Sequence, residues 1–215
     1  MKIEIDRDRP GYYKEIWPGT WDKFSHYEFV ANIPQALFLI TTLKENGKAN
    51  ACFHSWSAFS GDPGGFFAVL TGLSQQSHTY GNIMRDKEFC VNFLSADYYD
   101  ACMKTIELNC TDNDELEAAE LIAEPSSIVK PPRVKEAFLS LECRLHSSTD
   151  LSGKGRIAMV IGEVVNAAVM RGHSDYAEPF GGEGFMYYIG AALNPETGDH
   201  LEIAHVAELT PVRPA

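Results

Sequence analysis

The sequence predicts a mainly β protein, an antiparallel barrel with a few peripheral helices. Apolar and β-branched runs are more frequent than helical patterns, and turn residues recur at short intervals between them. These runs do not alternate with long helices, as they would in a βαβ sheet. With 215 residues, the chain is long enough to bury a full core.

Composition and charge argue against several classes of function and binding partner. A formal net charge of −12 argues against a nucleic-acid partner, because such proteins need a basic face. No apolar run approaches the roughly 18 residues of a membrane span, so no membrane association is expected. The five cysteines form no C-x-x-C pair, which gives no sign of a metal site and favours a reducing, cytoplasmic location.

Residues 1–33 are predicted to form an N-terminal extension that packs on a barrel domain of residues 34–215. Ile3 and Ile5 alternate with polar residues as in a short strand, and an aromatic stretch containing Trp17 and Trp21 follows. So many aromatic rings are unfavourable in water. The segment either caps the barrel or serves as a lid or dimer arm over a cofactor.

The first half of the barrel reads as a hairpin, a third strand, a short helix and a fourth strand. Asn46-Gly47 supplies a tight turn, because these residues readily adopt positive φ. The predicted strands are Ala36 to Leu43, Ala49 to Phe59, Gly65 to Leu73 and Glu88 to Leu94, with a helix from Tyr80 to Asp86.

The second half begins with helical periodicity and returns to strands. Gly162 is expected to kink a long strand, since barrel corners often need glycine. The predicted elements are helices over 97–108 and 111–122, strands over 126–129, 137–147, 156–170 and 185–189, and a flexible glycine-rich turn from Phe180 to Gly184. His200 and His205 are expected to be ordinary surface residues.

Two polar stretches interrupt the first half. The second arm of the hairpin carries Asn50, His54, Ser55, Trp56 and Ser57 where an ordinary core strand would stay apolar. A further polar run, residues 74–79, leads into the short helix. Hydroxyls before a helix N-terminus suit a phosphate, and aromatic side chains suit a planar ring. The alternative is that these residues are turn, cap and core residues.

A series of motifs resembles the flavin reductase-like family of FMN-binding split β-barrels, which includes flavoredoxins. The similarity extends over residues 34–190. Its pieces are Pro34-Gln35-Ala36-Leu37, Gly47-Lys48-Ala49-Asn50-Ala51, Asp62-Pro63, His78-Thr79-Tyr80-Gly81-Asn82-Ile83, Phe89-Cys90-Val91-Asn92-Phe93, Leu141-Glu142-Cys143 and Gly162-Glu163-Val164. The resemblance implies a Greek-key split barrel that holds FMN without a covalent bond.

The resemblance also assigns candidate cofactor residues. Residues 50–57 would line the ring and ribityl chain, and the phosphate candidates are Ser55, Ser57, Ser77, His78 and Thr79, with Asn82 behind them. Many relatives carry an Arg or Lys just before the threonine, whereas this chain has Gln75, Gln76, Ser77 and His78 there. The phosphate would then depend on hydroxyls, backbone amides, His78 or a distant Lys or Arg, so FMN is either a loosely held cofactor or a substrate.

The catalytic residues stay unassigned, because no nucleophile–base arrangement stands out. The resemblance implies an oxidoreductase that passes electrons from NAD(P)H to flavin or a later acceptor. The alternatives are an electron carrier reduced by a protein donor and a flavin-binding module without turnover. A homodimer is expected, because a barrel of this size leaves a ring cofactor partly exposed.

Overall fold

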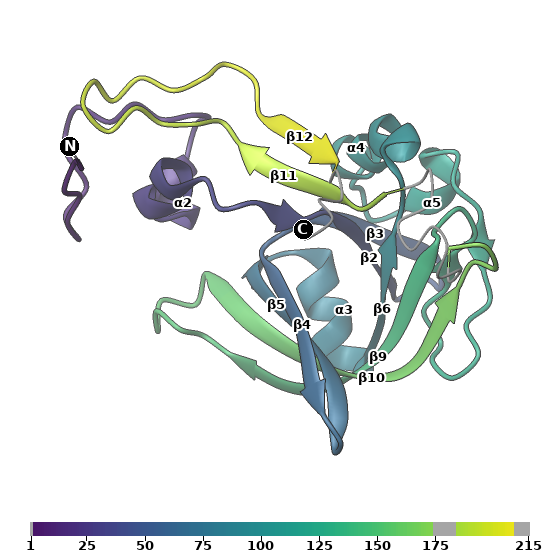
Figure 1. Cartoon of the computed structure of the whole chain (residues 1–215). Coiled ribbons are helices and arrows are strands. Elements are labelled where there is room, and N and C mark those ends of the chain that lie inside the picture. Colours follow the sequence, from purple (N-terminus) through teal and green to yellow (C-terminus); the bar gives the residue numbers. More distant parts are fainter. Residues whose placement is uncertain (1, 174–183, 209–215) are drawn as a thin grey trace, which may run out of the picture.

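The computed structural model describes residues 2–173 and 184–208, and most of its regular structure is antiparallel β-sheet. A seven-stranded sheet in the order β3-β2-β6-β9-β10-β5-β4 curls into the barrel (Figure 1). Its strands are β2 (Phe38–Leu43), β3 (Ala49–His54), β4 (Ser57–Asp62), β5 (Gly65–Ser74), β6 (Glu88–Phe93), β9 (Leu139–Thr149) and β10 (Ile157–Val169). The ladder ends at β3 and β4, so the barrel is split, and the predicted fold class is confirmed.

Two smaller sheets complete the β-structure of the described residues. One has the order β1-β11-β12, and the other pairs β7 with β8. Their strands are β1 (Gln35–Ala36), β7 (Ala123–Glu124), β8 (Arg133–Val134), β11 (Met186–Gly190) and β12 (His205–Glu208). β11 confirms the predicted strand over 185–189, but β12 follows it, so it is not the final strand. The predicted strand Ala36 to Leu43 is divided into β1 and β2, and β12 carried no clear signal in the sequence.

The helices are short and lie around the barrel. They are α1 (Thr20–Lys23), α2 (His26–Ala31), α3 (His78–Asp86), the 3₁₀ turn η1 (Ala96–Tyr98), α4 (Tyr99–Glu107) and α5 (Glu115–Ala118). Helix α3 contacts β2 and β3, and α4 and α5 also pack on β3. No helix in the described ranges is long and apolar enough to cross a membrane.

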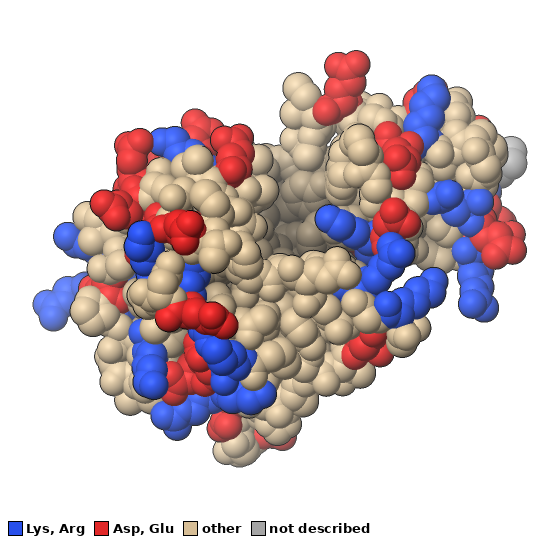
Figure 2. All heavy atoms as spheres, turned by 180° about the vertical axis from the view of Figure 1, so that it is seen from behind, with Lys and Arg blue, Asp and Glu red and all other residues tan. Residues whose placement is uncertain are grey.

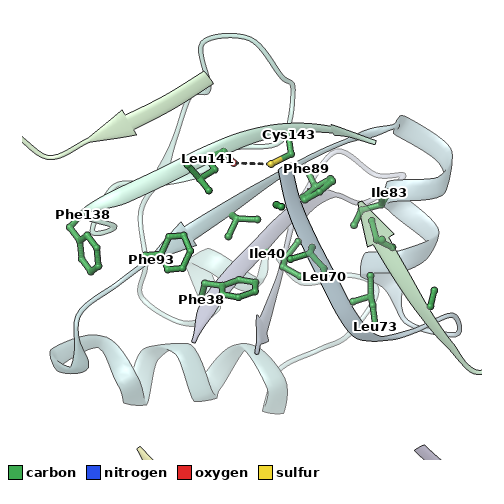
Figure 3. Packing of buried hydrophobic residues seen from close by; sticks show 14 residues of the cluster. Phe38, Ile40, Leu70, Leu73, Ile83, Phe89, Phe93, Phe138, Leu141 and Cys143 are labelled. Carbon is green, nitrogen blue, oxygen red and sulfur yellow. Dashed lines mark hydrogen bonds between the residues drawn. The ribbon is translucent and has the colours of Figure 1, made fainter. Parts of the chain in front are cut away.

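Strand β2 is buried on both faces, as its apolar run predicted. Phe38 and Ile40 face the barrel interior, whereas Leu37 and Leu39 join the cluster under α4 and α5. Figure 3 shows the interior cluster, in which Phe38 and Ile40 pack with side chains of other strands and with Ile83 of α3. A third cluster joins the N-terminal helices through Phe29 to Leu193.

The predicted long second arm, 49–59, is wrong as a single strand. Strand β3 ends at His54, and Ser55 and Trp56 separate it from β4. β4 then pairs with β5 instead of continuing along β2. Trp56 has φ 54°, in the left-handed region that bulky residues rarely adopt. This one residue redirects the chain from one edge of the sheet to the other.

The predicted strand over 126–129 is also wrong. The buried Glu142 carboxylate accepts the backbone N–H groups of Ser127, Ile128 and Val129 at 2.9, 2.6 and 3.2 Å, so these groups bond to a side chain and not to a neighbouring strand. The short strands β7 and β8 lie on either side of this loop.

Four further expectations differ in outcome. The helix over 111–122 shrinks to α5, because Asp114 caps it by accepting the N–H groups of Leu116 and Glu117. No strand forms around Ile3 and Ile5. The kink at Gly162 is confirmed, since the register of β9 and β10 shifts there. Residues 180–183 of the predicted glycine-rich turn lie outside the described residues.

Candidate functional site

The kink at Trp56 brings the split edges of the barrel together. The Trp56 carbonyl accepts the Thr71 N–H at 2.8 Å and the Thr71 hydroxyl at 2.9 Å. Among the described residues, the backbone N–H groups of Ser55 and Trp56 have no hydrogen-bond acceptor. Two unused donors beside a strained residue are typical of a place where a ligand binds.

His54 lies at the same junction but is part of the interior. Its Nε2 is 2.8 Å from the Thr71 carbonyl, and because a carbonyl can only accept, Nε2 carries the proton. Burial lowers the pKa of His54 to about 4, although the bond to Thr71 opposes this effect. His54 is therefore neutral at physiological pH and holds the split edges together.

Trp56 lies on the outer side of this junction. Its ring is 5.0 Å from that of Phe24, which follows α1, and 5.9 Å from that of Tyr188 on β11. Gly72 packs beside this ring with a φ of 72°, a left-handed backbone conformation that favours glycine. The predicted ring-binding residue is thus half-buried between the N-terminal segment and the sheet.

The polar run before α3 forms the cap of that helix. The Ser77 hydroxyl accepts the Tyr80 N–H at 3.2 Å and donates to the Ser74 carbonyl at 2.7 Å. His78 is exposed, and its Nδ1 lies 2.9 Å from Asn109 Oδ1. The predicted helix is present, but it begins at His78, two residues earlier than predicted.

Two more candidate pairs fasten α3 to the sheet. Asn50 Nδ2 donates to the Thr79 hydroxyl at 3.0 Å, and Asn82 Nδ2 donates to the Thr42 hydroxyl at 3.0 Å. Asn50, Thr79 and Asn82 are all buried. Their side chains are therefore already engaged in joining helix and barrel.

A cavity of about 460 Å³ lies between α3 and the hairpin that joins β2 to β3; we call it the hairpin cavity. Its lining includes Ser77, His78 and Asn82 of the predicted set. Its charged lining residues are Lys44, Arg85, Glu45 and Asp112, so the charges cancel.

The two cations of the hairpin cavity are already paired. Lys44 Nζ lies 2.8 Å from the buried Glu115 carboxylate, and Arg85 forms two hydrogen bonds to Asp86 at 2.7 and 2.6 Å. This cavity offers little net attraction to a phosphate.

A second cavity, of about 310 Å³, lies on the other side of the run 74–77; we call it the loop cavity. Its lining includes Lys23, Asp22, Ser74, Gln76 and Arg156, with a net charge of +1. In the part of the chain that the structure describes, Lys23 has no salt-bridge or side-chain hydrogen-bond partner.

Arg156 is held beside the run by its own backbone. The Arg156 carbonyl accepts the Gln75 N–H at 2.8 Å. Its guanidinium contacts Asp22 through Nη1 alone, with Nη1 3.3 Å from Asp22 Oδ1. The other N–H groups of Arg156 have no protein acceptor among the described residues, so this cavity holds unused cationic donors next to the predicted phosphate run.

No local sequence pattern pointed to Lys23 and Arg156 as site residues. One comes from the N-terminal segment and the other from the start of β10, each distant along the chain from residues 74–79. The absence of Arg and Lys within the run was the only indication that a cation would come from elsewhere. The predicted residues 54–57 line neither the hairpin cavity nor the loop cavity.

The face opposite to that of Figure 1 is hollowed between two lobes (Figure 2). The hollow is formed mostly by uncharged residues, and Lys and Arg side chains gather along one of its sides. Such a surface suits a ligand with a flat, uncharged ring and an anionic end. In the described residues, no group of His, Cys, Asp and Glu has the arrangement of a metal site.

Comparisons with known proteins identify the family and the fold. The family described as "Flavin reductase like domain" matches residues 30–189. An uncharacterized protein of Aquifex aeolicus is 26% identical over 168 residues, covering 74% of this chain and 85% of that protein.

Two solved structures share the fold. Nitrilotriacetate monooxygenase component B from Bacillus cereus has a TM-score of 0.77 at 18% identity, covering 100% of this chain and 99% of the other. Flavoredoxin from Methanosarcina acetivorans has a TM-score of 0.70 at 15% identity, covering 100% and 95%.

Proposed function

Because the chain belongs to the flavin reductase-like family, we propose that it is an FMN-binding oxidoreductase that passes electrons from NAD(P)H to flavin or to a downstream acceptor. The observation that carries the proposal is the loop cavity, where two incompletely paired cations lie beside the polar run 74–77. FMN would supply the hydride and electron chemistry, and the protein would bind and orient it.

The residues around Trp56 fit a flavin ring. The N–H groups of Ser55 and Trp56, which have no acceptor within residues 2–173 and 184–208, can donate to ring nitrogen or carbonyl oxygen atoms. The Trp56 ring offers a flat apolar surface, with Phe24 and Tyr188 beside it. The ring would occupy the outer side of the junction, where movement of Phe24 would expose the Trp56 ring.

The loop cavity fits the phosphate. Ser74 and Gln76 provide neutral donors, while Lys23 and Arg156 provide charge-assisted ones. The Asp22 carboxylate in the same lining opposes a phosphate, so the site has a modest net positive charge. This arrangement supports moderate FMN affinity.

Proton transfer by His54 is not part of the proposal. The side chain is neutral and its Nε2–H is used by Thr71. Hydride transfer between two rings depends on their relative position more than on a general acid. We therefore assign His54 a positioning role, as the residue that holds β3 against β5.

The electron donor is tested by anaerobic stopped-flow spectroscopy of the protein with FMN, mixed with NADH and then with NADPH. Rapid loss of the flavin absorption with either nucleotide supports the proposal. A yellow protein that neither nucleotide reduces would instead fit an electron carrier with a protein donor. Absence of FMN binding would overturn both.

The phosphate site is tested with Arg156→Gln. We expect FMN to bind about fivefold more weakly, because a charge-assisted bond at a half-exposed position is worth about 1 kcal/mol. Riboflavin, which lacks the phosphate, should bind unchanged. Lys154→Gln, an exposed lysine two residues away, is the matched control and should leave both affinities unchanged.

The variant His78→Gln tests which of the two cavities holds the FMN phosphate. If the phosphate lies in the loop cavity, this substitution leaves FMN affinity within about twofold of the wild type, a difference below 0.5 kcal/mol. A larger loss with His78→Gln than with Arg156→Gln would move the phosphate to the hairpin cavity.

The proposal also covers the role of the N-terminal segment, the oligomeric state and the cellular location. We propose that residues 1–33 are an extension that covers the ring face of the barrel domain, supported by the contact of Phe24 with Trp56. A homodimer would cover the exposed apolar side chains Tyr12, Trp17 and Ile33. Five unpaired cysteines support a reducing compartment such as the cytoplasm.

A further inference from the structure

A third cavity, of about 230 Å³, lies at the mouth of the barrel and is separate from the hairpin and loop cavities. Among the described residues, its lining is apolar or aromatic, and the Tyr187 hydroxyl is the one polar side-chain group there. The lining includes Ala36, Phe59, Phe93, Leu139, Leu141 and Phe185.

Aromatic rings form an ordered wall on one side of this cavity. The rings of Phe59 and Phe93 are 5.3 Å apart, those of Phe93 and Phe185 are 5.2 Å apart, and both pairs meet edge to face. Figure 3 shows Phe93 and Phe138 toward one end of the packed cluster, with Leu141 above them. Edge-to-face packing favours a further ring as the next neighbour.

We propose that this barrel-mouth cavity binds a small, uncharged aromatic compound of about one ring. Its volume exceeds the roughly 150 Å³ of an apolar protein cavity that takes up benzene. A charged or strongly polar ligand would lose its hydration without gaining partners, so phosphates and carboxylates are disfavoured. A three-ring flavin is too large to enter fully.

The position of the cavity gives such a ligand a place near the proposed cofactor. Phe59 follows Ser57 by two residues on β4, so both side chains point to the same face of the strand. Tyr187 lines the cavity on one face of β11, and Tyr188 contacts Trp56 on the opposite face of this strand. The ligand site itself does not depend on FMN binding.

Toluene and benzoate are suitable probes, because they share one ring and differ in charge. Binding to the full chain is followed by the methyl NMR signals of Leu139 and Leu141. We expect toluene to shift these signals and to bind at least about tenfold more tightly than benzoate, a difference of about 1.4 kcal/mol.

Leu139→Phe places a ring in the cavity and should weaken toluene binding at least about tenfold. Ile122→Phe, a substitution at an exposed site outside the lining, is the control and should have no effect. If Leu139→Phe does not fold, Ala36→Leu fills the cavity from β1, with the same loss of binding read from Leu141.

Three results would overturn the proposal. Toluene could bind the filled and control variants equally, which would place it elsewhere. FMN could displace it competitively, which would make the cavity part of the flavin site. Toluene could bind only as a dimer dissociates, in which case a second copy of the chain occupies the cavity. None of these readouts uses reduction of flavin, so their failure is separate from failure of the proposed function.

Discussion

His54 makes a specific prediction about acid stability. Its pKa is lowered from 6.5 to about 4 in the folded chain, mainly by burial. Between these two values the unfolded chain binds a proton that the folded chain does not. The contribution of His54 to stability is therefore fully present above pH 6.5 and is lost as the pH falls toward 4.

The size of the effect follows from the two pKa values. A difference of about 2.5 pH units corresponds to about 3 kcal/mol of unfolding free energy. His54→Gln removes the titration while keeping an N–H that can donate to the Thr71 carbonyl. Between pH 7.5 and pH 4.5, we expect the unfolding free energy of the variant to fall by about 2–3 kcal/mol less than that of the wild type.

The assay is urea unfolding of both proteins at the two pH values, followed by far-UV circular dichroism. Other titrating groups act equally in both proteins, so they cancel in the comparison. An identical pH dependence in the wild type and His54→Gln would refute the buried, neutral state of His54. Greater acid sensitivity in the variant would refute it as well.

Three further substitutions test other parts of the structure. Trp56→Ala should weaken FMN by about 1–3 kcal/mol through lost ring contact, and fluorescence titration showing unchanged affinity in a folded variant would place the ring elsewhere. Gly162→Ala should destabilise the barrel by about 1–3 kcal/mol, because the new Cβ would lie 2.3 Å from Phe89 Cζ; an unchanged denaturation midpoint would contradict this packing. Glu142→Ala should lower stability by about 3–5 kcal/mol, because it leaves three backbone N–H groups without an acceptor, whereas Arg133 keeps its ion pair with Glu124. A loss below about 1 kcal/mol in urea unfolding would argue against this loop anchor.

The strands were largely predictable because their signal is local. Phe38 and Ile40 alternate with Leu37 and Leu39, and each set finds its own apolar cluster. The predicted strand over 126–129 failed because the Glu142 side chain replaces a strand as the hydrogen-bond partner of residues 127–129. Such a partner lies in another part of the chain and leaves no trace in local periodicity.

The candidate site was predictable only in part, for a related reason. Polar residues at 50–57 and 74–79 stand out against apolar strands, but periodicity does not say which of them are already paired. Asn50 and Thr79 satisfy each other, whereas the N–H groups freed at Trp56 arise from a backbone angle that no residue type signals. Arg156 reaches the phosphate run through the pairing of β10 with β5, a contact between distant segments.

The central claim is that FMN binds with its ring at Trp56 and its phosphate in the loop cavity. A crystal structure of the protein with FMN tests this most directly. The predicted result is a phosphate within hydrogen-bond distance, roughly 3 Å, of Arg156 or Ser74, with the ring against Trp56. A phosphate in the hairpin cavity beside His78, or a ring away from Trp56, would contradict it.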